Sequence, residues 1–293
     1  MHLRRILFPI DFSPAAEAMA PSVRELAQRF NASVTVLNAF NAVPEYIHGP
    51  ALGDAFGADG APIPYSPVLL ELREEREHRL KEFAQAHFSG IGHTQKVEDG
   101  DPAMVIKWAA EQEETDLIMM PTQGLGRFRR LLLGSVTAKI LHDIACPVWT
   151  SAHEPDPASK ALSGCRSVLC AVELNEEAAG VFDAAVVFAR AYGAKVCLLN
   201  IQSPSDAPGS QASAESIRVA FDRACDAGEK GIAVDAHVRT MDAAIAEGIR
   251  QTAREEGADL VIVGRGHARE TFSRAWSHLY TIIRESPCPV LSV

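Results

Sequence analysis

Short apolar runs alternate with longer amphipathic segments along the chain, a pattern that predicts alternating strands and helices. Arg5–Asp11 is almost continuously apolar, and the Ser13 and Pro14 that follow are typical of a helix N-cap and a first helical turn. We expect that helix to reach about Phe30 and a second strand to cover Ser33–Phe40. Strands with so few polar residues are typical of parallel sheets that helices cover on both faces.

The same order of elements returns in the second part of the chain. A strand is predicted at Ser167–Glu173, followed by a helix from a cap at Asn175 to about Tyr192. Another strand is predicted at Lys195–Ile201. The repeated unit is therefore a whole domain, far longer than the unit of a solenoid.

The ends of the two halves also correspond. Thr115–Met120 resembles Ala258–Val263, and the tripeptide Cys-Pro-Val stands at 146–148 and again at 288–290. The spacing of equivalent positions falls from 162 residues near the start to 143 near the end, so the first half is longer by about 19 residues. Most of this excess lies in Asn41–Ser66, which is rich in proline and glycine and predicts a long surface loop.

A polar, proline-containing stretch separates the halves. Ser151–Gly164 contains the run Glu-Pro-Asp-Pro, which is typical of a linker between domains. We therefore predict a first domain over 1–152, a linker over 153–164 and a second domain over 165–293. Each is predicted to be a doubly wound, Rossmann-like α/β domain, which binds ligands at the carboxyl ends of its strands.

Charge and composition exclude several classes of protein. Residues 1–150 and 151–293 each carry 14 basic and 19 acidic side chains, so neither half has the basic excess of a nucleic-acid-binding module. Pro9 and Asp11 interrupt the first apolar run before a signal-peptide core forms, and no apolar stretch approaches the roughly 18 residues of a membrane span. We expect a cytoplasmic protein without nucleic-acid or membrane partners, whose six cysteines are reduced and mostly buried.

The segment after the fourth predicted strand carries the candidate chemistry. From Met120 to Ser135 it reads Met-Pro-Thr-Gln-Gly-Leu-Gly-Arg-Phe-Arg-Arg-Leu-Leu-Leu-Gly-Ser, and a helix is expected from Val136 to about Ile144. Its glycines allow close approach of a ligand, and Ser135 is expected to cap a helix whose free N–H groups favour an anion. Arg127 and the two arginines at 129 and 130 would add positive charge suited to phosphate.

This segment resembles the nucleotide-binding loop of the universal stress proteins, whose ATP-binding members carry G-x2-G-x9-G-(S/T) after the fourth strand. The run here is Pro121-x2-Gly124-x9-Gly134-Ser135, so three of the four positions fit and a proline replaces the first glycine. The resemblance extends over both halves. It implies two tandem doubly wound domains of the adenine-nucleotide α-hydrolase-like kind, each with five parallel strands.

The resemblance also implies a ligand, which is ATP in the first domain only, with Mg²⁺ as its expected companion ion. Asp11 stands where the family's aspartate contacts the adenosine portion of the nucleotide, and Ala39 stands where a small residue borders adenine. The expected nucleotide contacts are Pro9, Ile10, Asp11, Ala39, Met120, Thr122, Gly124, Arg127, Gly134, Ser135, Val136 and Thr137. Pro121 lacks an N–H group, so a phosphate contact through that amide is lost and the affinity is reduced or the ligand changed.

Plainer interpretations of these residues exist. A strand-end aspartate can cap the junction to the next helix, and a glycine-rich loop can simply close a turn. Gly124 and Gly126 begin a dinucleotide fingerprint that lacks its last glycine and follows the wrong strand, which argues against NAD. Neither a Walker loop nor a G-x-S-x-G nucleophile elbow is present, so a motor-type NTPase and a hydrolase of that class are not supported.

The second half departs further from the motif. Its run is Gly264-x2-His267-x9-Ser277-His278, and Glu173 stands where the first half has Asp11. Side chains at 267 and 277 would crowd a phosphate, so we predict that this half does not bind ATP by the family's mode. The histidines and nearby arginines could form an anion site, although a solvated loop is the plainer interpretation.

The favoured function is a stress-response protein that binds ATP within residues 1–150 and signals through conformation or association, with Asn41–Ser66 as a lid over the nucleotide. No general base is evident in the loop, so any ATP hydrolysis is expected to be slow. The alternatives are a nucleotide-independent interaction module or binder of another small molecule, and an enzyme that uses ATP as substrate. Family members commonly pair through their last strands, which favours an internal pseudo-dimer of the halves or a homodimer of the chain.

Overall fold

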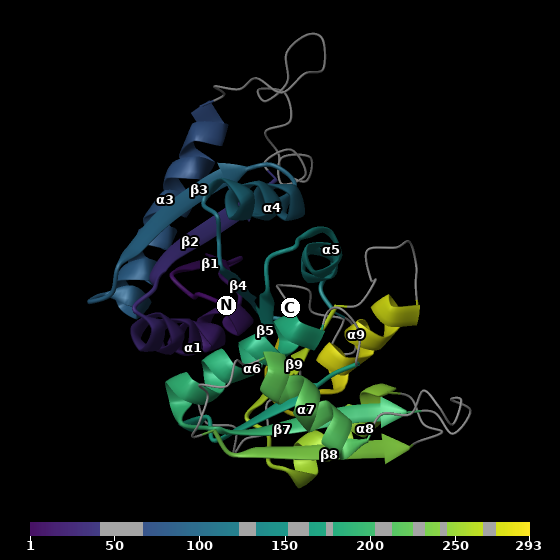
Figure 1. The fold of residues 1–293 in the computed structure, drawn as a ribbon. Helices are drawn as coiled ribbons and strands as arrows, with labels where there is room; N and C mark the ends of the chain where they lie inside the picture. The colour runs from purple at the N-terminus through teal and green to yellow at the C-terminus, as the bar shows by residue number, and fades with distance from the viewer. Residues whose placement is uncertain are drawn as a thin grey trace.

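The computed structural model describes residues 1–41, 67–122, 133–151, 164–173, 178–202, 213–224, 232–240, 245–265 and 274–293, and strands and helices alternate through both halves (Figure 1). The first half contains β1 (Arg5–Pro9), α1 (Pro14–Phe30), β2 (Ser33–Phe40), α3 (Pro67–Phe88), β3 (His93–Asp99), α4 (Pro102–Gln112), β4 (Leu117–Met120), α5 (Ser135–Asp143) and β5 (Val148–Thr150). The second half contains β6 (Ser167–Ala171), α6 (Ala178–Tyr192), β7 (Lys195–Gln202), α7 (Ala214–Ala224), β8 (Val234–Thr240), α8 (Ile245–Glu255), β9 (Leu260–Val263), α9 (Arg274–Glu285) and β10 (Val290–Ser292).

Helix α1 begins and ends where local chemistry predicts. The Ser13 hydroxyl accepts a hydrogen bond from the Ala16 N–H at 3.3 Å, and Pro14 is the first helical residue. Asn31 follows the last helical residue in the left-handed conformation, with φ of 51°, and its N–H bonds back to carbonyls of the last turn. The expected bounds of this helix and of β2 are confirmed.

Helix α4 is capped by a carboxylate that follows β3. Asp101 Oδ1 accepts hydrogen bonds from the N–H groups of Ala103 and Met104, both at 3.1 Å. The Met104 N–H contributes most to holding the pKa of Asp101 below its usual value, and Lys139 adds an ion pair at 3.3 Å. The cap thus ties α4 to the surface of α5.

Replacing Asp101 with alanine is expected to lower the free energy of unfolding by about 0.5–2 kcal/mol, because two N–H groups of α4 lose their acceptor. Asp101→Asn keeps an acceptor but not the charge. The pKa of Asp101 is lower in the folded state than in the unfolded state, so the charged carboxylate stabilises the fold at any pH above its unfolded-state pKa. This stabilisation is lost as the pH falls through the folded-state pKa of Asp101. Urea denaturation at neutral and acidic pH measures both effects, and equal stability of the three proteins at neutral pH would contradict the assignment of the cap.

The ten described strands form one sheet in the order β3-β2-β1-β4-β5-β10-β9-β6-β7-β8. Within each half all neighbouring strands are parallel, as the sequence predicts. The two five-stranded sheets are joined by β5 and β10, which pair antiparallel with Trp149 opposite Leu291. This pairing buries an edge strand of each half that would otherwise expose unpaired backbone groups.

Two hydroxyl groups reinforce the seam between the halves. Thr150 Oγ1 donates to the carbonyl of Val290 at 3.2 Å, and Ser292 Oγ donates to the carbonyl of Val148 at 3.2 Å. Both hydroxyl-bearing residues are fully buried. The two bonds are related by the same approximate twofold symmetry as the strands, so the halves form an internal pseudo-dimer, one of the two arrangements that the family resemblance implies.

Helices cover both faces of the sheet (Figure 1). One continuous apolar core unites buried residues of α1, α3, α6 and α7 with one face of the strands, and a second core unites those of α4, α5, α8 and α9 with the other. Phe188 of α6 lies 5.5 Å from Phe30 and 5.6 Å from Trp149, measured between ring centroids, and joins the halves on the first face. The two domains therefore share their hydrophobic cores.

On the opposite face the halves are joined by polar contacts. The guanidinium of Arg265 donates to the carbonyls of Ile144 and Cys146, and also to that of Ser292 at 3.2 Å. The Tyr280 hydroxyl accepts from the N–H of Leu133 at 2.9 Å. Arg265, which the sequence offered as part of an anion site, therefore bonds to the backbone of the other half.

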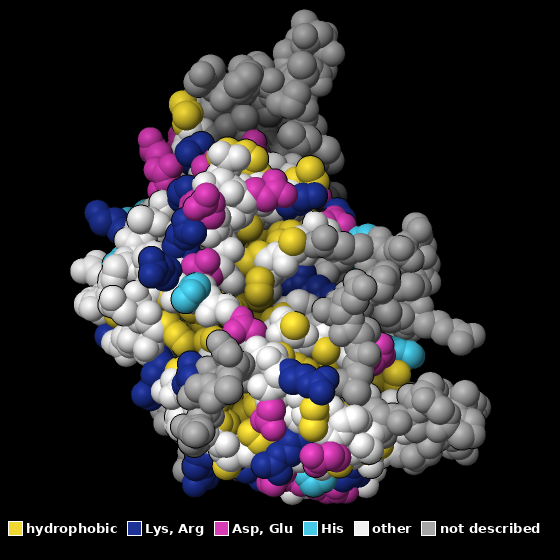
Figure 2. Space-filling model, in the orientation of Figure 1, with side chains coloured by type: hydrophobic (Ala, Val, Ile, Leu, Met, Phe, Trp, Pro, Cys, Tyr) yellow, Lys and Arg dark blue, Asp and Glu magenta, His cyan; other side chains and the backbone are white. Residues whose placement is uncertain are grey.

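The outer surface carries mixed charge. In Figure 2 acidic and basic side chains are interspersed over the face of α3, where Arg73 and Glu77 form an i,i+4 pair at 2.9 Å. Among the described residues, no helix combines the length and the apolar composition that crossing a membrane requires.

Candidate functional site

The predicted nucleotide contacts converge at one edge of the sheet. β1 lies between β2 and β4, so the carboxyl ends of these three strands are neighbours. Asp11 follows β1, Ala39 is the penultimate residue of β2, and Thr122 lies just beyond β4. The strand order reverses between β1 and β4, which is the place where open α/β sheets bind ligands.

The start of α5 is fixed to the end of β4 at this edge. The N–H of Gly134 donates to the carbonyl of Thr122 at 2.9 Å. One turn later, the buried Thr137 hydroxyl donates to the carbonyl of Pro121 at 3.1 Å. Pro121 thus contributes its carbonyl to the placement of α5, although it offers no N–H group.

The prediction that Ser135 caps α5 is wrong. Gly134 is the N-cap and Ser135 is the first helical residue, and Gly134 forms no side-chain capping hydrogen bond. Because glycine has no side chain to accept from the first turn, the first N–H groups of α5 have no capping acceptor among the described residues and are suited to attract an anion.

Asp11 is half-buried, and its carboxylate has a local structural role. Its Oδ1 accepts from the N–H of Ser13 at 3.0 Å, which closes the turn between β1 and α1. Asp11 therefore caps the junction between strand and helix, as the plainer interpretation of this residue predicts.

Sequence reasoning missed Asn38, which organises the end of β1. Its side chain is 1% exposed, donates to the carbonyl of Ile10 at 2.8 Å and accepts from Arg76 at 3.2 Å. The signal was an asparagine between apolar residues of a buried strand, because a buried amide group requires hydrogen-bond partners. Asn200 forms the same bond to the carbonyl of Val172 at 2.8 Å in the second half.

The described candidates divide by exposure. Asp11, Ala39, Gly134, Ser135 and Val136 have surface through which a ligand could be reached, whereas Pro9, Ile10, Met120, Thr122 and Thr137 are buried. The five buried residues belong to the packed interior next to the carboxyl ends of β1 and β4. Gly124, Arg127 and the expected lid, apart from its first residue, lie outside the described residues.

The second half differs at the equivalent position. α9 begins at Arg274, so Ser277 and His278 lie inside the helix, whereas their counterparts Gly134 and Ser135 form the start of α5. The N–H groups of a helix interior are engaged in its own hydrogen bonds. Glu173, the counterpart of Asp11, is exposed beyond β6, and His267 lies outside the described residues.

Five cysteines are described, and all are free thiols. Burial raises the pKa of the thiols of Cys146, Cys165, Cys197 and Cys288 to about 12. These four are therefore neutral and weakly nucleophilic at neutral pH, in agreement with the expectation of reduced, buried thiols.

Comparison with known proteins identifies the repeat. The sequence profile described as the universal stress protein family matches residues 2–151 and again 164–293. A universal stress protein of Thermus aquaticus is 31% identical over 145 residues, which are 50% of this chain and 96% of that protein. Another from Methanocaldococcus jannaschii is 30% identical over 145 residues, 50% of this chain and 79% of that protein.

Solved structures resemble the complete tandem fold. A crystal structure of a universal stress protein from Archaeoglobus fulgidus covers 98% of this chain and 97% of its own, with a TM-score of 0.73 and 21% identity. The cytoplasmic domain of a prokaryotic cation chloride cotransporter is similar over 99% of this chain and 95% of its own, with a TM-score of 0.54 and 9% identity. At these identities the likeness concerns the fold alone.

Proposed function

The chain belongs to the universal stress protein family, and on that premise we propose that its first half binds ATP and acts as a nucleotide-dependent regulatory protein in the stress response. The site lies at the carboxyl ends of β1, β2 and β4. Asp11 and Ala39 contact the adenosine portion, and the amino end of α5 receives the phosphates. Gly124 and Arg127, which stand between β4 and α5 in the sequence and lie outside the described residues, are the further phosphate contacts that we propose.

The observation that carries this proposal is the uncapped start of α5. Gly134 offers no side-chain acceptor, and its own N–H group is fixed to the carbonyl of Thr122. The aligned peptide dipoles place roughly half a positive charge at this helix end. A phosphate group there would gain both the charge and the free N–H donors.

The site is suited to binding rather than rapid hydrolysis. Among the described candidates only Asp11 has an ionisable side chain, and its carboxylate already accepts from the N–H of Ser13. A general base that activates water is therefore missing from this set. Mg²⁺ would be held chiefly by the phosphates of the nucleotide, as is usual for this ion.

Replacing Ser135 with aspartate tests the phosphate position without weakening the helix. A carboxylate in the first turn favours α5 through the helix dipole but repels a phosphate bound at the same place. We expect ATP affinity to fall about tenfold or more, which is about 1.4 kcal/mol, with the melting temperature maintained. Titration calorimetry should give one site per intact chain, because α9 does not present a helix start at the equivalent place.

Ser135→Asn is the matched control, since it has the shape of aspartate without the charge, and it should bind ATP far better than Ser135→Asp. Equal ATP affinity of all three proteins would contradict the proposed phosphate position. Failure of the intact chain to bind ATP would favour the alternative, a nucleotide-independent interaction module or a binder of another small molecule.

A further inference from the structure

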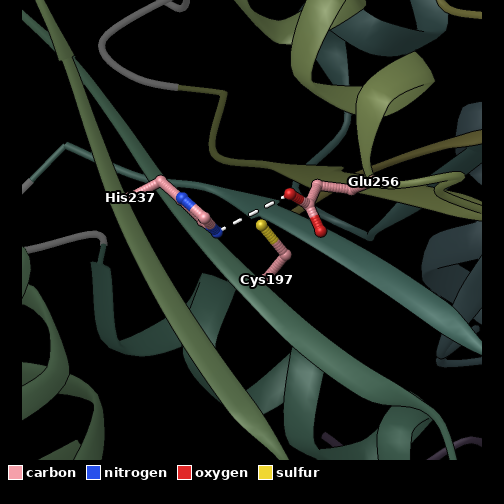
Figure 3. A group of neighbouring side chains, drawn as sticks. All are labelled: Cys197, His237 and Glu256. Atoms are coloured by element: carbon pink, nitrogen blue, oxygen red, sulfur yellow. Dashed lines mark ion pairs between the residues drawn. The ribbon is translucent and has the colours of Figure 1, made fainter.

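A cluster of three metal-ligating side chains lies in the second half, away from the proposed nucleotide site. It consists of Cys197 of β7, His237 of β8 and Glu256, which directly follows α8. Figure 3 shows the three side chains pointing toward one another from these separate elements. Their potential ligand atoms all lie within 4.8 Å of one another.

We propose that Cys197, His237 and Glu256 bind one Zn²⁺ ion, which ties the edge strand β8 to β7 and to the end of α8. The donor set of one sulfur, one imidazole nitrogen and one carboxylate oxygen suits this ion. Three protein ligands leave a fourth, tetrahedral position for water. This proposal is independent of ATP binding.

The polar atoms of the cluster are poorly satisfied by the protein itself. The Nε2 atom of His237 is buried and has no hydrogen-bond partner. It lies 3.7 Å from Glu256 Oε1, which is too long for a hydrogen bond. A buried nitrogen without a partner costs free energy, and a metal ion would supply the missing interaction.

Glu256 is held in position by a neighbouring cation. Lys195 Nζ bonds to Glu256 Oε2 at 3.0 Å, which leaves Oε1 on the side of His237. A group that holds the other oxygen of a ligating carboxylate is a usual supporting contact of metal sites. The lysine therefore orients the carboxylate and is compatible with the ion.

The first half contains three residues at the equivalent positions, which serve as an internal comparison. The corresponding pairs are Thr35 and Cys197, Lys96 and His237, and Glu113 and Glu256. In the first half, Thr35 Oγ1 donates to Glu113 Oε2 at 2.6 Å, and Lys96 pairs with Glu113 Oε1. There the threonine and the lysine both pair with the carboxylate, through a hydrogen bond and an ion pair, and the Oε1 atom of Glu113 makes no hydrogen bond. The second half has replaced the threonine and the lysine with the two residue types that bind zinc best.

The geometry allows an ion to enter and be bound. Cys197 and the Nε2 atom of His237 are buried, whereas the side chains of Glu256 and His237 as a whole are 22% and 40% exposed, so an ion would reach the cluster from their side by a shift of these side chains. Zinc requires ligand atoms about 3–4 Å apart, so the ligands must approach by about 1 Å, which rotation of the partly exposed His237 side chain toward the carboxylate held by Lys195 can supply. Binding replaces the thiol proton with a sulfur–zinc bond and releases one proton to solvent.

The test uses the full chain, freed of metal by a chelator and titrated with Zn²⁺ against a chromophoric competitor. We expect one equivalent to bind, and Co²⁺ in its place to give a thiolate-to-metal charge-transfer band. Cys197→Thr and His237→Lys introduce the residues of the first half and should each weaken Zn²⁺ binding by at least tenfold. Cys197→Thr should also remove the cobalt band.

Two control variants are matched to these changes. Cys165→Ala removes another buried thiol, and His142→Lys replaces a histidine outside the cluster, so both should bind zinc like the original protein. Circular dichroism of the metal-free proteins verifies that each variant is folded. The proposal is overturned if the chain binds no Zn²⁺ at micromolar concentration, or if binding persists unchanged in folded His237→Lys.

Discussion

Phe188→Ala is expected to lower the free energy of unfolding by about 3–5 kcal/mol, the usual cost of removing a fully buried phenylalanine. The ring is 0% exposed and packs against Phe30 and Trp149 of the first half and against Tyr192 of its own helix. The cavity would open between the halves. We therefore expect the original chain to unfold in one transition, because its halves share both cores, and Phe188→Ala to unfold in two, measured by scanning calorimetry.

Phe182→Ala provides the matched control for this prediction. Phe182 is also fully buried on α6, but its aromatic contact is Phe221 of the same half, at 5.3 Å between ring centroids. Its loss should cost a similar free energy without separating the transitions of the halves. If Phe188→Ala and Phe182→Ala gave the same calorimetric profile, the shared core would not couple the halves.

Asn38→Ala is expected to affect both stability and nucleotide binding. The change removes the hydrogen bonds that Asn38 makes to the carbonyl of Ile10 and to the guanidinium of Arg76. We expect the free energy of unfolding to fall by about 1–3 kcal/mol, and by more if the charged guanidinium stays buried. Because Ile10 precedes Asp11, the end of β1 should also lose its fixed position. We expect ATP affinity to fall about tenfold, measured by calorimetry below the melting temperature of the variant.

Asn200→Ala separates these two effects. Asn200 bonds to the carbonyl of Val172 as Asn38 bonds to that of Ile10, so its loss should destabilise the second half by a similar amount. ATP affinity should remain unchanged if nucleotide binds in the first half alone. Equal losses of affinity in Asn38→Ala and Asn200→Ala would show that general destabilisation is responsible.

Much of the fold could be predicted because the relevant signals are local. Apolar strands, the Ser13 cap and the left-handed position at Asn31 depend on residues close together in the sequence. The repeat could be recognised because both halves carry the same order of such signals. The spacing of the glycines likewise predicts that the candidate loop connects the fourth strand of the first half to the helix that follows.

The details of the candidate site were less predictable because they depend on where each helix begins. Ser135 has the composition of a cap, yet the chain enters the helix one residue earlier, at Gly134. In the second half, Ser277 replaces that glycine and the helix already starts at Arg274. Where two neighbouring residues have nearly the same propensity to begin a helix, packing of the helix against the sheet decides which of them does so.

The sequence by itself determined the order of strands and helices, the duplication and the position of the candidate loop in the chain, since these follow from residue type and spacing. The family resemblance implied pairing of the last strands but left open whether it occurs within one chain or between two. The tertiary structure decided that β5 and β10 join two sheets into one, because a strand of three residues does not specify its partner. It also brought together Asn38 with Ile10, and Cys197 with His237 and Glu256. Such contacts arise from the register of neighbouring strands and the closure of distant loops, which no local pattern of residues encodes.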